Sequence, residues 1–439
     1  MAAPTKAVIL PPSSTEHFGS IIPFAEPTWY NTSSSTTPFY KESHIRLRNE
    51  IRKYYEESVI PHAAKWEEEG RVPDDVFKRG AQKGYVAAAV AHYGLSVEDL
   101  RAAGVSLPGN IDPSKWDIFH DFILTGVVWG MGGGNAIGCP PIINFASPQL
   151  RQEVLPGILN GSIRVCLGIT EPEAAVKTDD GNHYRVNGSK KWITNALCTH
   201  GGGGLYVQTL ADTYKDGMKG ISMLLIPLKS KGIKMRPLKN SGVNSSGSTY
   251  IEFDDVIVDK KYLLGRENEG FRIIMSNFNH ERLSLAQLSL RMSRICAEDA
   301  FSHAVTRSTF GKLLIENQVI REKLGKMGRR IESLQAWIEL ICHHYQLSCE
   351  VSKAKADREV AASVALAKVE AGRTLEEVCR EAQQILGGLA YQRGSGRGAR
   401  IEQISRDVRV MVVGGGSEEI LTELGMRQQI VNFMAKSRM

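Results

Sequence analysis

The middle of the chain has a different residue pattern from the segments on either side of it, and this difference constrains the fold more than any other feature. Between Arg164 and Phe253, β-branched residues concentrate and alternate with polar ones, as in HYRVNGSKKWIT, LYVQTL, ISMLLIPL and TYIEFDDVIV. The pairs NG and DG and the run GGGG separate short strands of this kind. The flanking segments instead place apolar residues at helical spacing. The sequence therefore predicts an α+β protein with a compact β domain between two helical regions.

Four parts follow from this pattern. The first forty residues are rich in Ser, Thr and Pro and are typical of an arm without a packed core. The next segment, KESHIRLRNEIRKYYEESVIPHAAKWEEE, is helix-forming with a break at Pro61, and a long helical stretch follows Gly270. The predicted parts are an N-terminal arm (1–40), a helical domain (41–163), a β domain (164–270) and a C-terminal helical domain (271–439).

Composition excludes some classes of function. The 439 residues are 42% apolar and 23% charged, which is ordinary for a globular protein. The formal charge of +6 is spread along the chain without a basic stripe, so we expect anionic small molecules and no nucleic acid as partners. No run of about 18 apolar residues is present, so we expect no membrane span. Seven scattered cysteines are typical of reduced thiols in an intracellular protein.

Two local patterns suggest sites that we set aside. In CHHYQLSC, Cys342 and Cys349 share one face of a helix, whereas His343 and His344 turn away, and this is no standard zinc spacing, so we predict no metal site. GMGGGNAIG does not have the glycine offsets of a dinucleotide-binding loop, and a Walker loop is absent. If the chain binds a nucleotide, it must therefore do so with another kind of loop.

The run VVGGGSEEILTEL contains three consecutive glycines. They indicate either close approach of a ligand or another chain to the backbone, or a simple connector. Ser417 is a candidate N-cap of a helix whose first turn holds Glu418 and Glu419, which suit the positive end of the helix dipole.

Five motifs together resemble the acyl-CoA dehydrogenase family of flavoproteins. The family's β domain carries a TEPxAGSD loop and a WITN strand, and this chain has CLGITEPEAAVKT and VNGSKKWITNA. The likeness continues through RSTFGKLLIENQ, QQILGG and RDVRVMVVGGGSEE, in family order and spacing, from about residue 45 to the end. The resemblance implies an N-terminal helical domain, a middle β domain and a C-terminal four-helix bundle.

The resemblance implies FAD as the cofactor. Thr170 and the backbone near Leu167 and Ile169 would bond the pyrimidine edge of the flavin, and Trp192 would lie against the ring. Thr194 would donate its hydroxyl to N5, the atom that accepts the hydride.

The resemblance also implies a groove for the pyrophosphate and adenosine of FAD. An arginine beside glycines suits a diphosphate, because it offers paired donors and the glycines permit close backbone approach. In the family, part of this groove comes from a neighbouring subunit, so we expect a homo-oligomer, a tetramer or a dimer. The implied residues are Arg307, Phe310, Gln318, Gln384, Gly387, Gly388, Gly416, Ser417 and Glu419.

The catalytic base is the notable difference within the family. Many members have a glutamate at the second position of the glycine triplet, where this chain has Gly415. Glu281, in SNFNHERLSLA, resembles the base of the long-chain and isovaleryl branches, and we expect it to open a helix. Glu281 would remove the α proton of an acyl-CoA or related thioester while flavin N5 takes the β hydride, with the flavin ribose and the backbone at Gly415 holding the thioester oxygen.

Other substrate positions partly depart from the family. Asn279 and Arg282 resemble positions that face the acyl-CoA, although Arg282 could instead be a structural ion-pair partner. Val176 replaces the serine of AGSD, and Asn244 stands where an arginine is usual. Three readings stay open: a dehydrogenase using an electron-transfer flavoprotein, an oxidase using oxygen, and a flavin-bearing protective protein without turnover.

Two further expectations concern substrate size and location. The glycines at 414–416 should free volume for branched or bulky acyl groups. The start MAAPTKAVILPPSSTEHF lacks an import signal, and Ser437, Arg438 and Met439 resemble the C-terminal tripeptide of peroxisomal proteins. We therefore expect a peroxisomal protein, with a cytoplasmic one as the alternative.

Overall fold

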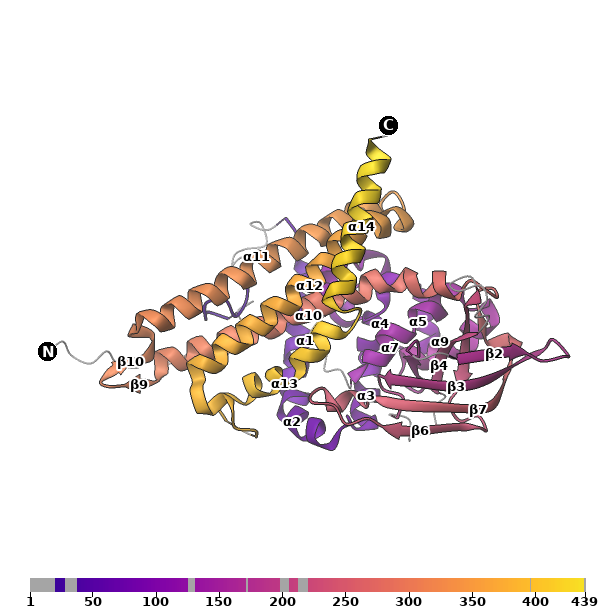
Figure 1. Cartoon of the computed structure of the whole chain (residues 1–439), viewed down its shortest axis with the longest axis horizontal. Coiled ribbons are helices and arrows are strands. Elements are labelled where there is room, and N and C mark those ends of the chain that lie inside the picture. Colours follow the sequence, from indigo (N-terminus) through magenta and orange to yellow (C-terminus); the bar gives the residue numbers. More distant parts are fainter. Residues whose placement is uncertain are drawn as a thin grey trace. The chain divides into compact units, whose positions relative to one another are not determined.

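The computed structural model of the chain describes residues 20–27, 38–124, 131–170, 173–197, 205–211, 220–394 and 396–437 (Figure 1). The chain divides into two compact units: a sheet unit, residues 50–278, and a helical unit, residues 279–439 together with those before 50. The division falls within α1 (Glu42–Ser58) and α10 (Gly270–Thr306). Residues 1–19 and 28–37 of the predicted arm lie outside the described residues, and the predicted domain limits remain a prediction.

The sheet unit contains two four-stranded sheets. The pairing is antiparallel except between β1 and β4, which are parallel. One sheet has the order β1 (Arg164–Leu167), β4 (Leu205–Ala211), β5 (Ser222–Pro227), β8 (Leu263–Leu264). The other has the order β2 (Glu173–Lys177), β3 (His183–Ile193), β7 (Thr249–Asp259), β6 (Ile233–Pro237).

A shared apolar core joins the two sheets. Ile251, Phe253 and Val256 of β7 point inward and are buried with Leu224 and Ile226 of β5. Because alternate residues of a strand face opposite sides, one side of β7 fills this core and the other faces solvent. The predicted β domain is confirmed.

One turn prediction within this domain is wrong. The DG pair at 180–181 does form the turn between β2 and β3, with Gly181 at a φ of +69°. The NG pair does not form a turn: Asn187 and Gly188 lie inside β3 at a break in its register with β7. The Asn187 side chain exchanges two hydrogen bonds with Asp255 of β7, so the pair forms a bulge that the neighbouring strand stabilises. The GGGG run, 201–204, lies outside the described residues.

Short helices precede the strands in the sheet unit. They are α2 (Ile60–Glu69), α3 (Asp74–Gln82), α4 (Tyr85–Ala88), α5 (Val97–Ala103), α6 (Ile118–Leu124), α7 (Gly133–Gly138), α8 (Pro140–Phe145) and α9 (Pro148–Leu159). The break expected at Pro61 is confirmed, because α1 ends at Ser58 and Pro61 stands in the first turn of α2, where its missing N–H costs no hydrogen bond.

Long helices make up the helical unit and lie side by side (Figure 1). Together with the C-terminal part of α10 they are α11 (Gln318–Cys349), α12 (Lys353–Leu386), α13 (Ala399–Val413) and α14 (Glu418–Lys436). α12 packs against α11, α13 and α14. The expected helix start at Ser417 is confirmed, although its side chain makes no capping hydrogen bond. Within the described ranges, none of the helices has the length and apolar character needed to cross a bilayer.

Two glycines of α11 provide a test of packing in the helical unit. A β-carbon at Gly328 would lie 2.4 Å from the Phe24 ring, whereas one at Gly325 would meet nothing within 4 Å. We expect Gly325→Ala to raise the free energy of unfolding by about 0.5–1 kcal/mol, because alanine favours a helix over glycine. Gly328→Ala should lose this gain, because the Phe24 ring must move. Chemical denaturation of both variants measures the difference, and an equal gain at both sites would show that Phe24 does not pack here.

Candidate active site

In the sheet unit, β3 and the segment after β1 form the place predicted for the flavin edge. The buried Lys190 donates from Nζ to the Ile169 carbonyl at 3.3 Å. The Lys191 N–H donates to the Thr170 carbonyl, also at 3.3 Å. These bonds hold the segment that follows Leu167 along the end of β3, so Ile169 and Thr170 lie beside the strand that carries Trp192.

Trp192 is strained and exposed. Its φ is +60°, in the left-handed region that non-glycine residues rarely occupy, and 57% of its surface is exposed. It lies where the register of β3 with β7 shifts between Lys190 and Ile193. Thr194 follows in a turn and is half-buried. Strain of this kind gathers at functional sites. The Lys191 ammonium lies over the Trp192 ring, 4.7 Å from its centroid, and more than half of the Trp192 surface is still open to a flat ligand.

Asn195, which the sequence analysis missed, determines the path of this turn. It is 2% exposed at a φ of +64°. Its Oδ1 accepts from the Gly134 N–H at 2.6 Å, and its Nδ2 and its backbone N–H both donate to the Ser246 carbonyl at 2.8 Å. A β-carbon at Gly134 would lie 2.9 Å from the Val165 carbonyl, so glycine permits this approach. The signals in the sequence were the glycine-rich GMGGGNAIG and the WITN motif, which ends at Asn195.

A carboxylate was also missed. Glu67 of α2 is 8% exposed and accepts from the N–H groups of Asn244 at 2.6 Å and Ser245 at 2.9 Å. It thereby holds the loop in which Val243 has a φ of +45°. Asn244 thus contributes its backbone to the structure of this loop, whatever its side chain does.

In the helical unit, Glu281 lies in the interior of α10, so the expectation that it opens a helix is wrong. α10 begins at Gly270 and continues to Thr306 without a break. The residues before Glu281 are apolar at helical spacing, and nothing in SNFNHERL stops a helix. Glu281 is half-buried.

Arg282 connects Glu281 to the glycine loop. Its side chain is 5% exposed, and its Nε donates to the Gly415 carbonyl at 3.1 Å. Burial lowers the pKa of Arg282, and the neighbouring Glu281 carboxylate opposes this shift.

The other residues predicted to face the substrate lie in both units. The Asn279 side chain donates to the Asp357 carbonyl at 2.9 Å, and Val176, in the sheet unit, is exposed on β2. The substrate roles of these residues remain predictions.

The glycine loop, Gly414–Gly416, has a backbone that suits glycine. Gly415 has a φ of +70° and Gly416 a φ of +116°. Lys368 of α12 donates from Nζ to the Val412 carbonyl at 2.6 Å and to the Gly416 carbonyl at 2.9 Å. Lys368 is 2% exposed, and this burial lowers the pKa of its ammonium to about 8. The positive charge of Arg282 also lowers this pKa, whereas the negative charge of Glu418 raises it. Its signal in the sequence is a lysine at a core position of the helix, spaced with Val364, Ala371 and Leu375.

The expectation that the three glycines free volume for bulky acyl groups remains a prediction, and a side chain at Gly415 would leave the backbone toward α10. A β-carbon at Gly415 would lie 2.9 Å from Cδ1 of Leu285 and 3.6 Å from Cγ of Arg282. Side chains of α10 therefore already fill this space.

The loop leads directly into α14. Ser417 occupies the N-cap position, Glu419 is exposed, and Glu418 forms a bidentate ion pair with Arg373 at 2.5 and 3.0 Å. The ion pair holds the pKa of Glu418 below its usual range.

Six of the nine residues predicted for the pyrophosphate groove lie at one end of the helical unit, whereas Gly416, Ser417 and Glu419 lie in the glycine loop and the first turn of α14, next to the part of α10 that carries Arg282. Arg307, Gln318, Gln384, Gly387 and Gly388 are all exposed. Phe310 is fully exposed at a φ of +49°, in the turn between β9 (Ser308–Thr309) and β10 (Lys312–Leu313). Lys323 at the start of α11 is paired with Glu381 near the end of α12, and Arg397 donates to Thr306 at 3.1 Å. The first contact places Gln318 near Gln384, Gly387 and Gly388, and the second places the segment after Gly388 near Arg307.

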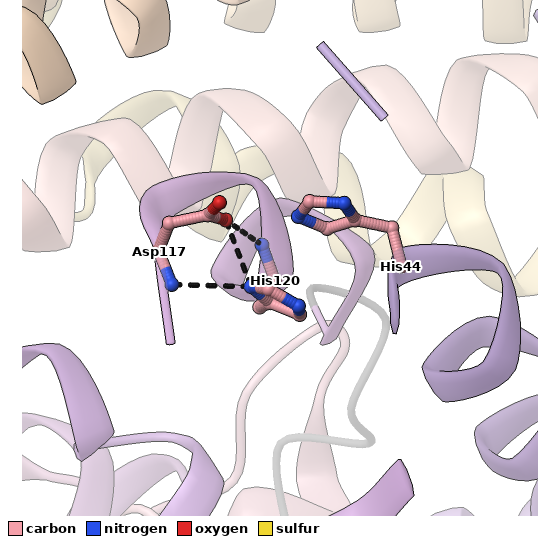
Figure 2. Close-up of side chains that lie close together, drawn as sticks. All are labelled: His44, Asp117 and His120. Carbon is pink, nitrogen blue, oxygen red and sulfur yellow. Dashed lines mark hydrogen bonds and ion pairs between the residues drawn. The ribbon is translucent and has the colours of Figure 1, made fainter. Parts of the chain in front are cut away.

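His44, Asp117 and His120 have possible metal-ligand atoms within 4.8 Å of one another. Figure 2 shows Asp117 and His120, whose hydrogen bonds run from the Asp117 N–H to Nδ1 at 3.1 Å and from the His120 N–H to Oδ1 at 3.2 Å. His44, labelled in the same figure, accepts the Lys41 N–H on Nδ1 at 2.8 Å. In α11, Cys342 is buried while His343 and His344 are exposed, as expected. We assign no metal site to these residues.

Known proteins of one family match this chain over most of its length. Family models described as the N-terminal, middle and C-terminal domains of acyl-CoA dehydrogenase match residues 41–106, 166–256 and 268–430. The chain is 41% identical to acyl-CoA dehydrogenase AFT10-1 of Alternaria alternata, over 94% of this chain and 96% of that protein. It is 27% identical to the mitochondrial long-chain specific acyl-CoA dehydrogenase of Sus scrofa, over 89% of this chain and 87% of that protein. Among solved structures, acyl-CoA dehydrogenase complexed with FAD from Bacillus anthracis has a TM-score of 0.77 at 20% identity, covering 91% of this chain and 69% of that chain.

Proposed function

Because this chain belongs to the acyl-CoA dehydrogenase family, we propose that it desaturates the α,β carbon–carbon bond of an acyl-CoA or a related acyl thioester, with Glu281 as the base. The protein is an oxidoreductase and a flavoprotein, and its cofactor is FAD. When bound, FAD supplies the acceptor for the hydride equivalent that leaves the β carbon.

Several exposed groups support the proposed cofactor contacts. Trp192 and Phe310 are aromatic residues with positive φ and large exposed surfaces. Each would gain apolar contact from a ring or an adenosine laid against it. The Thr170 and Thr194 hydroxyls would bond the polar flavin edge, and the Arg307 guanidinium would pair with the diphosphate.

One observation carries the assignment of Glu281. Arg282, the next residue on α10, is hydrogen-bonded to Gly415, the residue at the position where many family members have their base. Glu281 and Gly415 therefore belong to one neighbourhood, and a carboxylate on α10 can replace one on the loop. In this mechanism the Glu281 carboxylate accepts the α proton of the thioester. We place the chain in the branch of the family that has its base on this helix.

Glu281→Gln tests the base. The amide has nearly the same shape but accepts no proton, so FAD content should be unchanged while the rate of flavin reduction by substrate falls by about 10²- to 10⁴-fold. The measurement is anaerobic loss of flavin absorbance with straight, branched and aryl acyl-CoAs. Glu423→Gln is the matched control, because Glu423 is exposed on α14 and paired with Arg427. Reduction of Glu281→Gln at the wild-type rate would assign the base to another residue, and a wild-type flavin that no thioester reduces would contradict the proposed function.

We also propose that the chain forms a homo-oligomer. α14 exposes Ile430 and Phe433, one helical turn apart, and Phe310 is exposed at the implied cofactor groove. Light scattering after size exclusion should give a multiple of the chain mass, and Phe433→Asp should lower it. A wild-type monomer would exclude the assembly.

Peroxisomal location is a separate proposal. Ser437 is exposed at the end of α14, while Arg438 and Met439 lie outside the described residues. A receptor for such a tripeptide needs an accessible carboxylate, a cation and an apolar side chain. Residues 428–439 fused to a fluorescent reporter should direct it to peroxisomes, and the same fusion without Met439 should not. Diffuse fluorescence from the intact tail would remove this proposal and leave the enzymatic one untouched.

A further inference from the structure

We propose that Lys368 is a positioning residue for the reaction: it holds the glycine loop in the shape that its cofactor- and substrate-facing backbone needs. This inference rests on the proposed function for its catalytic consequence, and on the contacts of Lys368 for its structural part. Lys368 acts through the loop and itself has no assigned contact with substrate or cofactor.

Lys368 and Arg282 bind the loop from two helices. Lys368, on α12, donates to the carbonyls of Val412 and Gly416 at 2.6 and 2.9 Å, and Arg282, on α10, donates to that of Gly415 at 3.1 Å. Three carbonyls within five consecutive residues are thus held by two buried cations. Val412 is in the last turn of α13, where carbonyls lack helical partners and the dipole favours a cation.

The loop needs such an external hold because it has no side chains of its own. Three consecutive glycines are free to adopt many backbone conformations, and ordering them costs more entropy than ordering other residues. In a trans peptide the C=O and N–H groups point in opposite directions. Holding the carbonyls of Gly415 and Gly416 therefore also directs the N–H groups of Gly416 and Ser417, two of the residues implied in cofactor binding.

The position of Lys368 is costly, which supports a role beyond filling the core. Its ammonium is removed from water and lies near the like charge of Arg282, and both effects lower its pKa. With a pKa of about 8 it is still mainly protonated at pH 7, so both hydrogen bonds to the loop are charge-assisted.

Three variants test the inference in the full-length holoprotein at pH 7. Lys368→Met keeps the length and removes the donors, Lys368→Arg keeps a cation, and Lys368→Gln keeps a neutral donor. Arg330→Met is the control, because Arg330 pairs with Glu370 and Glu377 of the same helix α12 but at the surface, away from the loop. The first readout is amide hydrogen exchange of the peptide covering 411–421, which needs no substrate.

Lys368→Met should speed exchange in this peptide severalfold while peptides of α11 keep their wild-type rates. It should also lower the rate of flavin reduction by about 10- to 100-fold, with a smaller change in KM, because a displaced loop misplaces the reacting groups. Lys368→Arg should recover most of both effects, and Arg330→Met should show neither. If the methionine variant does not fold, Lys368→Gln should lie between wild type and full loss, with the arginine variant nearer to wild type.

Wild-type exchange of 411–421 in Lys368→Met would overturn the inference, and so would an arginine variant that recovers nothing. Loosening spread equally over α11, α12 and α14 would assign Lys368 a general structural role instead. A wild-type flavin that no thioester reduces, together with a loosened loop in Lys368→Met, would contradict the proposed function while the loop-holding role stands.

Discussion

Backbone polar groups in buried loops must find partners, and this constraint governs both units of the protein. Helices and sheets meet it by their own repeating hydrogen bonds. The turn after Trp192 and the glycine loop have no such repeat, so single buried side chains meet it instead. Asn195 does so in the sheet unit with one amide, and Lys368 does so in the helical unit with one ammonium. The two segments that carry most of the implied functional backbone are therefore each shaped by a residue with no implied ligand contact.

The choice of side chain follows from which groups need partners. Around Asn195 there is one N–H, of Gly134, and one carbonyl, of Ser246, so an amide that both accepts and donates satisfies the pair without a charge. Around Lys368 there are two carbonyls, so a group that only donates fits, and a positive charge suits the C-terminal end of α13, where the Val412 carbonyl lies. The charge carries a desolvation cost that the neutral amide avoids.

Local patterns in the sequence predicted the elements well, because the signals for them are local. Alternation identified the strands, and Pro61 and Ser417 marked helix starts. The failures have a different source. The conformation of Asn187 and Gly188 depends on β7, some 70 residues later in the chain. There Asp255 exchanges hydrogen bonds with the Asn187 side chain. A dipeptide that reads as a turn by itself becomes a bulge when a neighbouring strand supplies its partners.

The site divides in the same way. The resemblance identified the motif residues, and the structure shows that Arg282, next to Glu281 on α10, donates to the Gly415 carbonyl. Asn195, Glu67 and Lys368 escaped notice because nothing in their own neighbourhood of the sequence shows which distant carbonyl or N–H they meet. A polar side chain at a core position of a helix or turn does indicate that a hydrogen-bond partner exists somewhere in the fold, because burial without one is costly. It does not indicate which residue the partner is.

The glycine triplet is therefore not an empty version of a loop that elsewhere carries a base. The side of Gly415 on which a side chain would project is closed by Leu285, and its φ of +70° disfavours any residue with a β-carbon. Arg282 then uses the carbonyl of this residue as its acceptor. A carboxylate at 415 would have to displace Leu285 and strain the backbone that Arg282 and Lys368 hold. The glycine at 415 and the packing of Leu285, Arg282 and Lys368 around the loop therefore depend on one another.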